Sequence, residues 1–274
     1  MNMPLRWDLV TPDQLGTMLD DVETPEVWYL DALAECAGKV LARSGNGDLV
    51  FVGRSLDSMY DLLGGAVQDA DRVLRRFPVS FERGRGVAPD EVRRVREMAA
   101  EIGITPRSLA RRERPVTFVD VVWAGGTFER LFTLLEDWID EERETWPAIR
   151  RKLRFVGVTS RTGTSPNARR WHQDADWVRK LPASSVLNVS LEPLVWDYLG
   201  NSQTKLTWPY QLRRWREYLR EAKRDERTRT ALAEAVHLVA LGRTREVQRK
   251  IARAMDGEPA LSEPWLRALR SHLT

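Results

Sequence analysis

The chain is poor in the residues that build covalent cross-links and metal centres. Its 274 residues include one cysteine, Cys36, and three histidines, His172, His237 and His272. A single cysteine excludes an internal disulfide framework and a zinc site made of cysteines, and three scattered histidines argue against a multi-histidine metal centre. The sequence therefore gives no sign of a disulfide-rich protein or of a cysteine–histidine metal protein.

Long apolar runs are also missing. No stretch reaches the roughly 18 consecutive apolar residues that a membrane-spanning helix requires, so no membrane segment is expected. The first 16 residues lack the basic region and apolar core of a secretory leader, so we expect no export and a cytoplasmic location. With 42% hydrophobic and 30% charged residues, the composition is that of an ordinary globular protein, long enough for one large domain or a domain with an appendage.

The charge is unevenly distributed along the chain. Residues 205–274 contain 16 basic and 9 acidic side chains, whereas residues 1–204 contain 27 basic and 31 acidic ones. This asymmetry indicates either an acidic partner for the tail or a dipolar surface, and the interleaving of basic and acidic residues favours the surface. The tail has no continuous basic stripe and no DNA-binding signature, so we do not expect a nucleic-acid partner.

Short apolar runs alternate with helical periodicity over the first two thirds of the chain. Strands are predicted at 48–54, 77–81, 114–121, 153–160 and 184–191, with helices at 25–40, 55–67, 89–103 and 127–142. Several of the strands are apolar on both faces, which is typical of a parallel sheet covered on both sides. We therefore predict an α/β fold, an open parallel sheet flanked by helices with a C-terminal helical segment.

This pattern divides the chain into two parts. Residues 1–204 form the predicted α/β domain, with a core of about 25–191, and from residue 205 the pattern is helical only. Residues 205–274 are therefore interpreted as a basic helical extension, and as a candidate hood over the site. The sequence is also compatible with a homodimer.

One stretch, PVTFVDVVWAGGTFERLFTLLEDWI (Pro115–Ile139), combines a β-branched run, one acidic residue, a glycine turn and an amphipathic pattern. Because ligands bind beyond the carboxyl ends of parallel strands, the run would carry Asp120 to that edge. Gly125 and Gly126 would let an anion approach the backbone without meeting a Cβ, at the positive end of the following helix. Thr127 could donate its hydroxyl to a phosphate, or it could merely cap the helix of a plain βα connection.

The segment VDVVWAGGT (Val119–Thr127) resembles the signature of the type I phosphoribosyltransferases, in which a hydrophobic strand and two acids precede a Thr/Gly-rich loop. The resemblance implies that Asp120 binds ribose hydroxyls of phosphoribosyl pyrophosphate as the catalytic position. It also implies a loop for the 5-phosphate, formed by Ala124, Gly125, Gly126, Thr127 and Phe128. The segment departs from the family in two places: Val121 stands where the second acid is expected, and Ala124 where a hydroxyl residue is usual.

The upstream sequence extends this resemblance, which covers roughly residues 40–160. LVFVGRSLDSMYDLL is placed where the family has its pyrophosphate loop, so Arg54 and Ser55 are implied to face pyrophosphate. Arg83 and Arg85, after the next strand, are where the family often has a basic residue for the same anion, and a planar guanidinium suits phosphate oxygens. The alternatives are a helix start at Ser55 and solvated loop charges at Arg83 and Arg85.

A long passage after the strand at 153–160 is rich in arginine and tryptophan. Arg161 could bind an anion, and Trp171 or Trp177 could stack on a nucleobase, as the matching loop of the family helps to shape the base pocket. The competing interpretation, which we favour because the chain has eleven tryptophans, is that both indoles anchor the loop to the core.

These features predict a protein that binds phosphoribosyl pyrophosphate or a ribose 5-phosphate nucleotide and transfers the phosphoribosyl group to or from a nitrogenous base. The resemblance implies Mg²⁺ ligated mainly by substrate oxygens and water, with Asp120 touching it only through water. Two alternatives stay open. Val121 favours a non-catalytic phosphosugar sensor of the same fold, and a nucleotide N-glycosidic hydrolase would need the same phosphate-binding loop.

Overall fold

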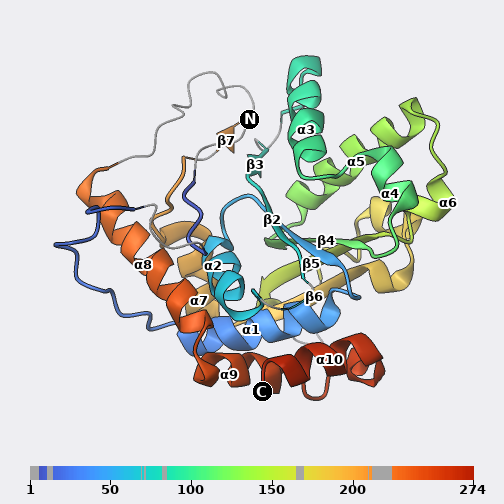
Figure 1. The fold of residues 1–274 in the computed structure, drawn as a ribbon. Coiled ribbons are helices and arrows are strands. Elements are labelled where there is room, and N and C mark those ends of the chain that lie inside the picture. Colours follow the sequence, from blue (N-terminus) through green and yellow to red (C-terminus); the bar gives the residue numbers. More distant parts are fainter. Residues whose placement is uncertain are drawn as a thin grey trace.

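The protein folds around one five-stranded parallel sheet (Figure 1). The structure is a computed structural model and describes residues 6–10, 15–68, 70, 72–81, 85–164, 170–208, 210–211 and 224–274. The strands of the sheet are β1 (Asp48–Val52), β2 (Leu74–Phe77), β4 (Val116–Val121), β5 (Leu153–Ser160) and β6 (Val186–Leu191). A separate parallel pair joins β3 (Val79–Ser80) to β7 (Tyr210–Gln211).

The strand order places the reversal of the sheet between β1 and β4. The order is β2-β1-β4-β5-β6, and every neighbouring pair is parallel. The chain therefore winds from β1 outward to β2, returns to β4 on the other side of β1, and continues outward to β6. Connections that leave in opposite directions open a crevice at the carboxyl ends of the two central strands, which is where open α/β sheets bind ligands.

Helices cover both faces of the sheet, because alternate strand residues face opposite sides. One face packs on α1 (Leu30–Arg43) and α2 (Asp57–Ala66) through residues such as Phe51 and Val156. The other face packs on α3 (Pro89–Glu101), α4 (Pro106–Arg111) and α5 (Gly126–Glu141) through residues such as Phe118 and Phe155. The shorter helices are α6 (Trp146–Ile149) and α7 (Pro193–Asp197). Both sides of the central strands are buried, as their uninterrupted apolar runs require.

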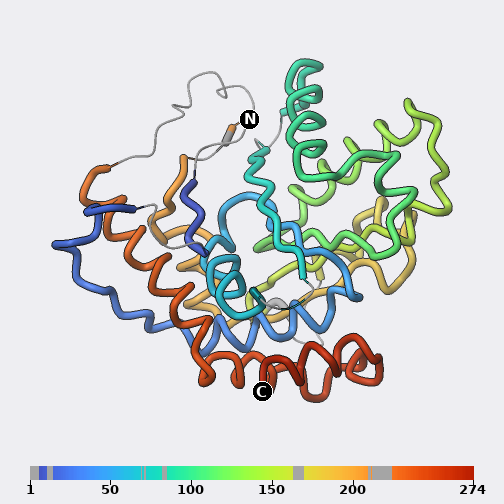
Figure 2. Tube along the Cα trace, viewed as in Figure 1, coloured from blue at the N-terminus to red at the C-terminus, as the bar shows by residue number. Residues whose placement is uncertain are grey.

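The C-terminal helices share the core of the first face. They are α8 (Glu226–Gly242), α9 (Arg245–Ala254) and α10 (Pro264–His272). α8 packs on α2 and α9 packs on α1, and Leu238, Ile251 and Leu266 belong to the same buried cluster as the helices of the sheet. The N-terminal segment lies alongside α8 (Figure 2), where the Arg229 side chain donates a hydrogen bond to the Met18 carbonyl at 2.8 Å.

The α/β architecture and the parallel sheet flanked by helices are confirmed. Three features differ from expectation. The first helix begins at Leu30 rather than Pro25. An edge strand, β2 at Leu74–Phe77, precedes the predicted one, and the tail that was expected to be helical only also contributes the strand β7. None of the helices within the described ranges is both long and apolar enough to cross a lipid bilayer.

Candidate functional site

A cleft opens where β1 and β4 end, at the reversal point of the sheet. It has two adjoining compartments that share Ser55, Phe81, Thr127, Gly200 and Asn201 in their walls. The larger, of about 640 Å³, is lined by the turn between β4 and α5 and by aromatic residues. The smaller, of about 220 Å³, is more polar and contains Arg54, Asp120 and Lys205.

The glycine turn between β4 and α5 forms the floor of the larger compartment. Gly125 is the residue before the first helical turn and has φ 78°, in the left-handed region that favours glycine. No side chain caps α5, so the first backbone N–H groups of this 16-residue helix face the cleft without an intrahelical partner. A Cβ placed on Gly126 would meet nothing within 4 Å. An anion can therefore approach these amides directly, aided by the helix dipole.

Thr127 is the second residue of α5 rather than its cap. The helix begins one residue earlier, at Gly126, and no side-chain capping bond forms. The Thr127 side chain is half-buried and borders both compartments. The interpretation of this residue as a simple helix cap is therefore wrong, and its hydroxyl is available to a ligand.

Asp120 is the penultimate residue of β4 and borders the smaller compartment. It is 6% exposed, and among the described residues its only hydrogen bond comes from the adjacent Val121 N–H at 2.8 Å. Burial raises the pKa of this carboxyl well above its usual range, against the opposing effects of the Val121 N–H and the charge of Lys205. Asp120 can therefore form hydrogen bonds to sugar hydroxyls at this strand end.

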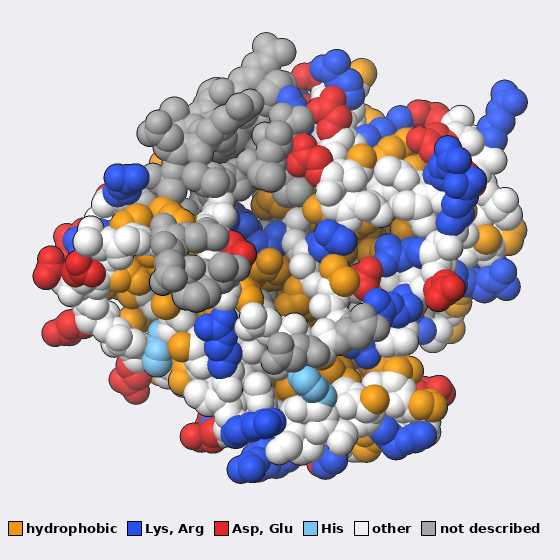
Figure 3. Space-filling view, in the orientation of Figure 1, with side chains coloured by type: hydrophobic (Ala, Val, Ile, Leu, Met, Phe, Trp, Pro, Cys, Tyr) orange, Lys and Arg blue, Asp and Glu red, His pale blue; other side chains and the backbone are white. Residues whose placement is uncertain are grey.

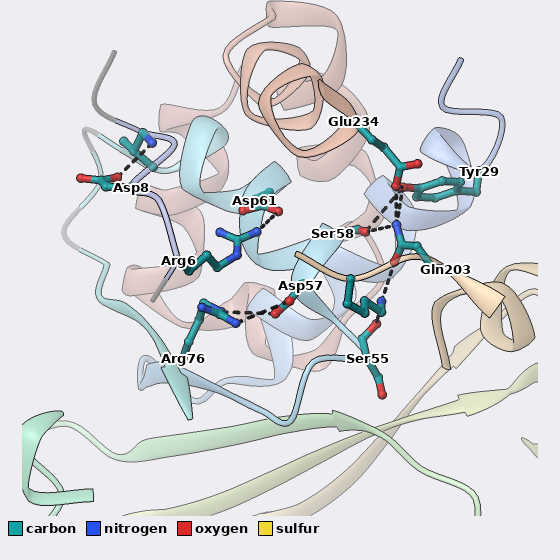
Figure 4. A network of polar contacts seen from close by, with 12 residues as sticks. Arg6, Asp8, Tyr29, Ser55, Asp57, Ser58, Asp61, Arg76, Gln203 and Glu234 are labelled. Carbon is teal, nitrogen blue, oxygen red and sulfur yellow. Dashed lines mark hydrogen bonds and ion pairs between the residues drawn. The ribbon is translucent and has the colours of Figure 1, made fainter. Parts of the chain in front are cut away.

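Cationic residues stand on the β1 side of the smaller compartment. Arg54 follows β1 and donates a hydrogen bond to the Thr207 carbonyl. Ser55 borders both compartments, and its carbonyl accepts a hydrogen bond from Lys205 Nζ at 3.2 Å. Asp57 and Ser58, the first residues of α2, are instead engaged in a buried polar network (Figure 4).

Two of the predicted aromatic contacts lie in the core. The Phe128 ring is fully buried against Phe155 and Trp171, although the residue also borders the larger compartment. Trp171 packs over the glycines of β4–α5 and β5, stacks at 6.2 Å on the buried Trp177, and donates a hydrogen bond to Asn188 Oδ1 at 2.6 Å. Neither indole borders the two compartments, in agreement with their interpretation as core anchors.

Two of the other predicted arginines, Arg85 and Arg161, do not border either compartment. Arg85 is exposed and pairs with Glu91 at 2.9 Å, beside the first turn of α3. Arg161 is exposed after β5 and lies near Glu35 of α1. There its charge helps to lower the pKa of that carboxyl, although the hydrogen bond from Lys39 is the larger cause. Arg83 lies outside the described residues.

Sequence reasoning missed several residues that the fold brings to the cleft. Lys205 and Gln203 come from the segment after α7, and Trp196 comes from α7 itself. Trp123, in the turn after β4, is 73% exposed at the larger compartment, and its ring lies 5.9 Å from that of Trp196. Only Trp123 carried a local signal, because it stands inside the nine-residue motif.

A larger cavity of about 890 Å³ lies at the opposite, amino-terminal edge of the sheet. Its arginines Arg112 and Arg114 share Asp48 as an ion-pair partner, and Arg72 lies over the Trp265 ring, so these cations already have partners within the protein. Elsewhere on the surface, acidic side chains lie among the basic ones on the face shown in Figure 3. The cleft at the switch point is the better candidate, because it combines an open helix N-terminus, a buried carboxyl and a lysine without a carboxylate partner among the described residues.

The described residues contain no group of three or more histidine, cysteine or acidic side chains that could hold a metal ion by themselves. The cleft instead offers two carboxyl groups, Asp120 in the smaller compartment and Glu129 at the larger one, together with neutral hydroxyl and amide oxygens, backbone amides and cations. This set is suited to a phosphorylated, hydroxyl-bearing small molecule. No family model, curated protein or solved structure matches this chain.

Proposed function

We propose that the protein binds phosphoribosyl pyrophosphate or a ribose 5-phosphate nucleotide in this cleft, as a phosphoribosyltransferase-like enzyme. The observation that carries the proposal is the pairing of the uncapped α5 N-terminus behind Gly125 with the buried, singly hydrogen-bonded Asp120. An amide-lined floor suits the 5-phosphate, and a carboxyl at the strand end suits the ribose hydroxyls.

In this proposal the residues act by positioning and by electrostatic stabilisation. The amides at Gly126 and Thr127 hold the 5-phosphate, Asp120 orients the ribose, and Arg54 faces the leaving group. A nitrogen of the acceptor base forms a bond to the anomeric carbon as the bond from that carbon to the pyrophosphate oxygen breaks. Pyrophosphate leaves with the electron pair, and the base releases its proton to solvent.

The residues of the cleft fit a magnesium ion that is carried by the ligand. Asp120 is the one acidic side chain among the described residues of the smaller compartment, and the other oxygens there are neutral. Mg²⁺ binds well through one carboxylate, water and substrate phosphates, and when bound it supplies charge neutralisation on the phosphate oxygens.

Isothermal titration tests the binding proposal. The ligands are phosphoribosyl pyrophosphate, ribose 5-phosphate and nucleoside monophosphates, each with and without Mg²⁺. We expect micromolar affinity for the parent, at least about tenfold weaker binding for Asp120→Asn and for Thr127→Val, and no change for Asp140→Asn, an exposed acid on α5. Absence of binding by every ligand to the folded parent would overturn the proposal.

A non-catalytic sensor is the second candidate, and Val121 favours it. The valine packs with the apolar cluster under α1 and α2 and lies close to Gly200, so the position of the second acid is occupied by hydrocarbon. Pyrophosphate release from phosphoribosyl pyrophosphate in the presence of a panel of bases separates the two candidates. Tight binding without release would identify the sensor, whereas release of base from a nucleoside monophosphate would identify a hydrolase.

A further inference from the structure

Lys205 enters the cleft from the segment that follows β6 and α7 in the chain. It borders the smaller compartment together with Arg54 and Asp120. Its ammonium group donates one hydrogen bond to the Ser55 carbonyl at 3.2 Å and one to Gln203 Oε1 at 2.5 Å. Both acceptors are neutral, and an ammonium has three N–H donors, so one donor is left over among the described residues.

The acidic residues whose charges raise the pKa of Lys205, namely Asp57, Glu234 and Asp61, are already paired with other groups (Figure 4). Asp57 accepts two hydrogen bonds from Arg76, at 3.2 and 3.5 Å, and Asp61 pairs with Arg6 at 2.5 Å. On α8, Glu234 accepts hydrogen bonds from Tyr29 at 2.6 Å and from Tyr198 at 3.3 Å, and another from Gln203. Lys205 is therefore a half-buried cation without a carboxylate partner among the described residues.

Gln203 holds the ammonium in place. Its Nε2 lies within hydrogen-bonding distance of Ser58 Oγ (2.6 Å), Tyr29 OH (3.0 Å) and Glu234 Oε1. An ionised Glu234 can only accept, so the amide nitrogen must face it, and the amide oxygen must then face Lys205. The reverse orientation would set two donors against each other. The network thus extends from α8 and α2 to the cleft through one amide.

An uncompensated cation in this position is unfavourable unless an anion joins it. Burial lowers the pKa of Lys205 to about 8, and the charge of Arg54 acts in the same direction, whereas Asp57, Glu234 and Asp61 oppose the shift. Burial also raises the pKa of Asp120, the acid of β4 that borders the same compartment, well above its usual range, so a compensating negative charge is disfavoured there. The compartment therefore presents positive charge that the protein does not neutralise within its described residues.

We infer that Lys205 is a specificity-determining residue of the cleft, which selects ligands that place a second anionic group beside Asp120, and that Gln203 is its positioning residue. The inference rests on the proposed function for the rest of the ligand. The anionic group is either a diphosphate on the anomeric carbon or a carboxylate on the base, since both present oxygens that an ammonium binds. The first anion, the 5-phosphate, lies at the other end of the cleft over α5.

Titration of matched ligand pairs tests the inference. Ribose 5-phosphate, with one anionic group, is compared with phosphoribosyl pyrophosphate, and nicotinate mononucleotide is compared with nicotinamide mononucleotide. We expect Lys205→Met to weaken phosphoribosyl pyrophosphate, or the carboxylated nucleotide, by at least about tenfold and to leave ribose 5-phosphate unchanged. The pair that responds identifies the source of the anion. Lys180→Met, which removes an exposed lysine, is the control and should change neither.

The pH dependence separates a ligand contact from a structural role. Between pH 7 and pH 9.5 the phosphates stay ionised while Lys205 loses its proton, so the preference for the two-anion ligand should decline in the parent protein. Lys205→Arg should keep that preference across the range, because arginine does not deprotonate there. Gln203→Leu should weaken the preference without abolishing it. Equal loss of both ligands in Lys205→Met, or a preference that does not change with pH, would overturn the inference.

Inorganic pyrophosphate and nicotinate, titrated alone, distinguish this inference from the proposed function. If either binds the parent and not Lys205→Met while no phosphosugar binds, the lysine site stands and the proposed function fails. If a phosphosugar binds the parent and Lys205→Met equally well, the proposed function stands and the inference about Lys205 fails. A folded parent that binds none of the probes rejects both. Circular dichroism melting of each variant confirms that the fold is retained.

Discussion

Gly125 packs directly beneath the indole of Trp171. A Cβ built on the glycine would lie 2.3 Å from Trp171 Cε3, closer than real side-chain contacts allow, and the backbone there has φ 78°. Two independent constraints therefore require glycine at this position, the left-handed backbone and the aromatic ring above it. The turn that opens α5 is rigidly held by the core, which pre-organises its amides.

Gly125→Ala should destabilise the protein, whereas Gly126→Ala should not. The alanine at 125 combines a left-handed backbone with a clash against Trp171, a loss of about 3 kcal/mol. The alanine at 126 has open space and a helical backbone, so its unfolding free energy should stay within about 1 kcal/mol of the parent. Urea unfolding measures both. Equal effects would contradict the geometry of the turn.

Asp120→Asn should stabilise the protein increasingly as the pH rises from 4 to 8. The folded-state pKa of Asp120 is raised by burial, so above the unfolded pKa of about 3.9 the native state keeps a proton that the unfolded chain releases. Stability of the parent is therefore lost as pH rises through the folded pKa, and asparagine removes that slope. Thermal melts across the pH range check this, and a difference in melting temperature that is independent of pH would contradict it.

Truncation of Trp171 should lower the stability of the protein, whereas truncation of Trp123 should leave it almost unchanged. Trp171→Ala removes a half-buried ring and its hydrogen bond to Asn188, and should lower the unfolding free energy by about 3 kcal/mol. Trp123→Ala removes a ring that is 73% exposed, so stability should change by less than about 0.5 kcal/mol. In ligand titrations Trp123→Ala should alter affinity directly, whereas Trp171→Ala can act only through its packing on the Gly125 turn. A ligand effect confined to Trp171 would restore the original stacking hypothesis.

Breaking the Arg76–Asp57 pair from one side should cost more than replacing both partners. Both side chains are largely buried, and the arginine, together with Arg6, keeps the pKa of Asp57 low although burial alone would raise it. Arg76→Met leaves a buried carboxylate unpaired, a loss of about 3 kcal/mol, and the double variant with Asp57→Leu should recover most of it. A double-mutant cycle of urea unfolding measures the coupling, and additive effects would show that the pair is not coupled.

The fold was predictable wherever local pattern and burial agree. Residues 153–160 were predicted as a strand and form β5 with the same ends, and the helix predicted at 127–142 is α5 at Gly126–Glu141. The edge strand β2 was not recognised, because LRRF has two arginines and no apolar run. Arg76 is tolerated there because Asp57, on the preceding helix α2, supplies the opposite charge.

Only the β4–α5 side of the candidate site was predictable from the sequence. The order of strand, acid, glycines and helix places Asp120 and Gly125 at a common edge, because a strand and the helix that follows it must share that edge. Phe128 borders the larger compartment, but its ring lies in the core, as its helical spacing with Leu131 and Leu135 indicated. Trp171 and Trp177 pack in the core, in agreement with their interpretation as loop anchors, which was favoured because the chain has many tryptophans.

The sequence by itself determined the alternation of strands and helices, the glycine turn and the acid before it, because these depend on neighbours within a few residues. Only the tertiary structure decided that β1 and β4 flank the reversal, that Arg85 pairs with Glu91, and that Lys205 lines the same compartment as Asp120. The reason is physical. Lys205 is 85 residues from Asp120 along the chain, and its position is set by packing, by the amide of Gln203 and by the burial of charge, none of which has a local sequence pattern.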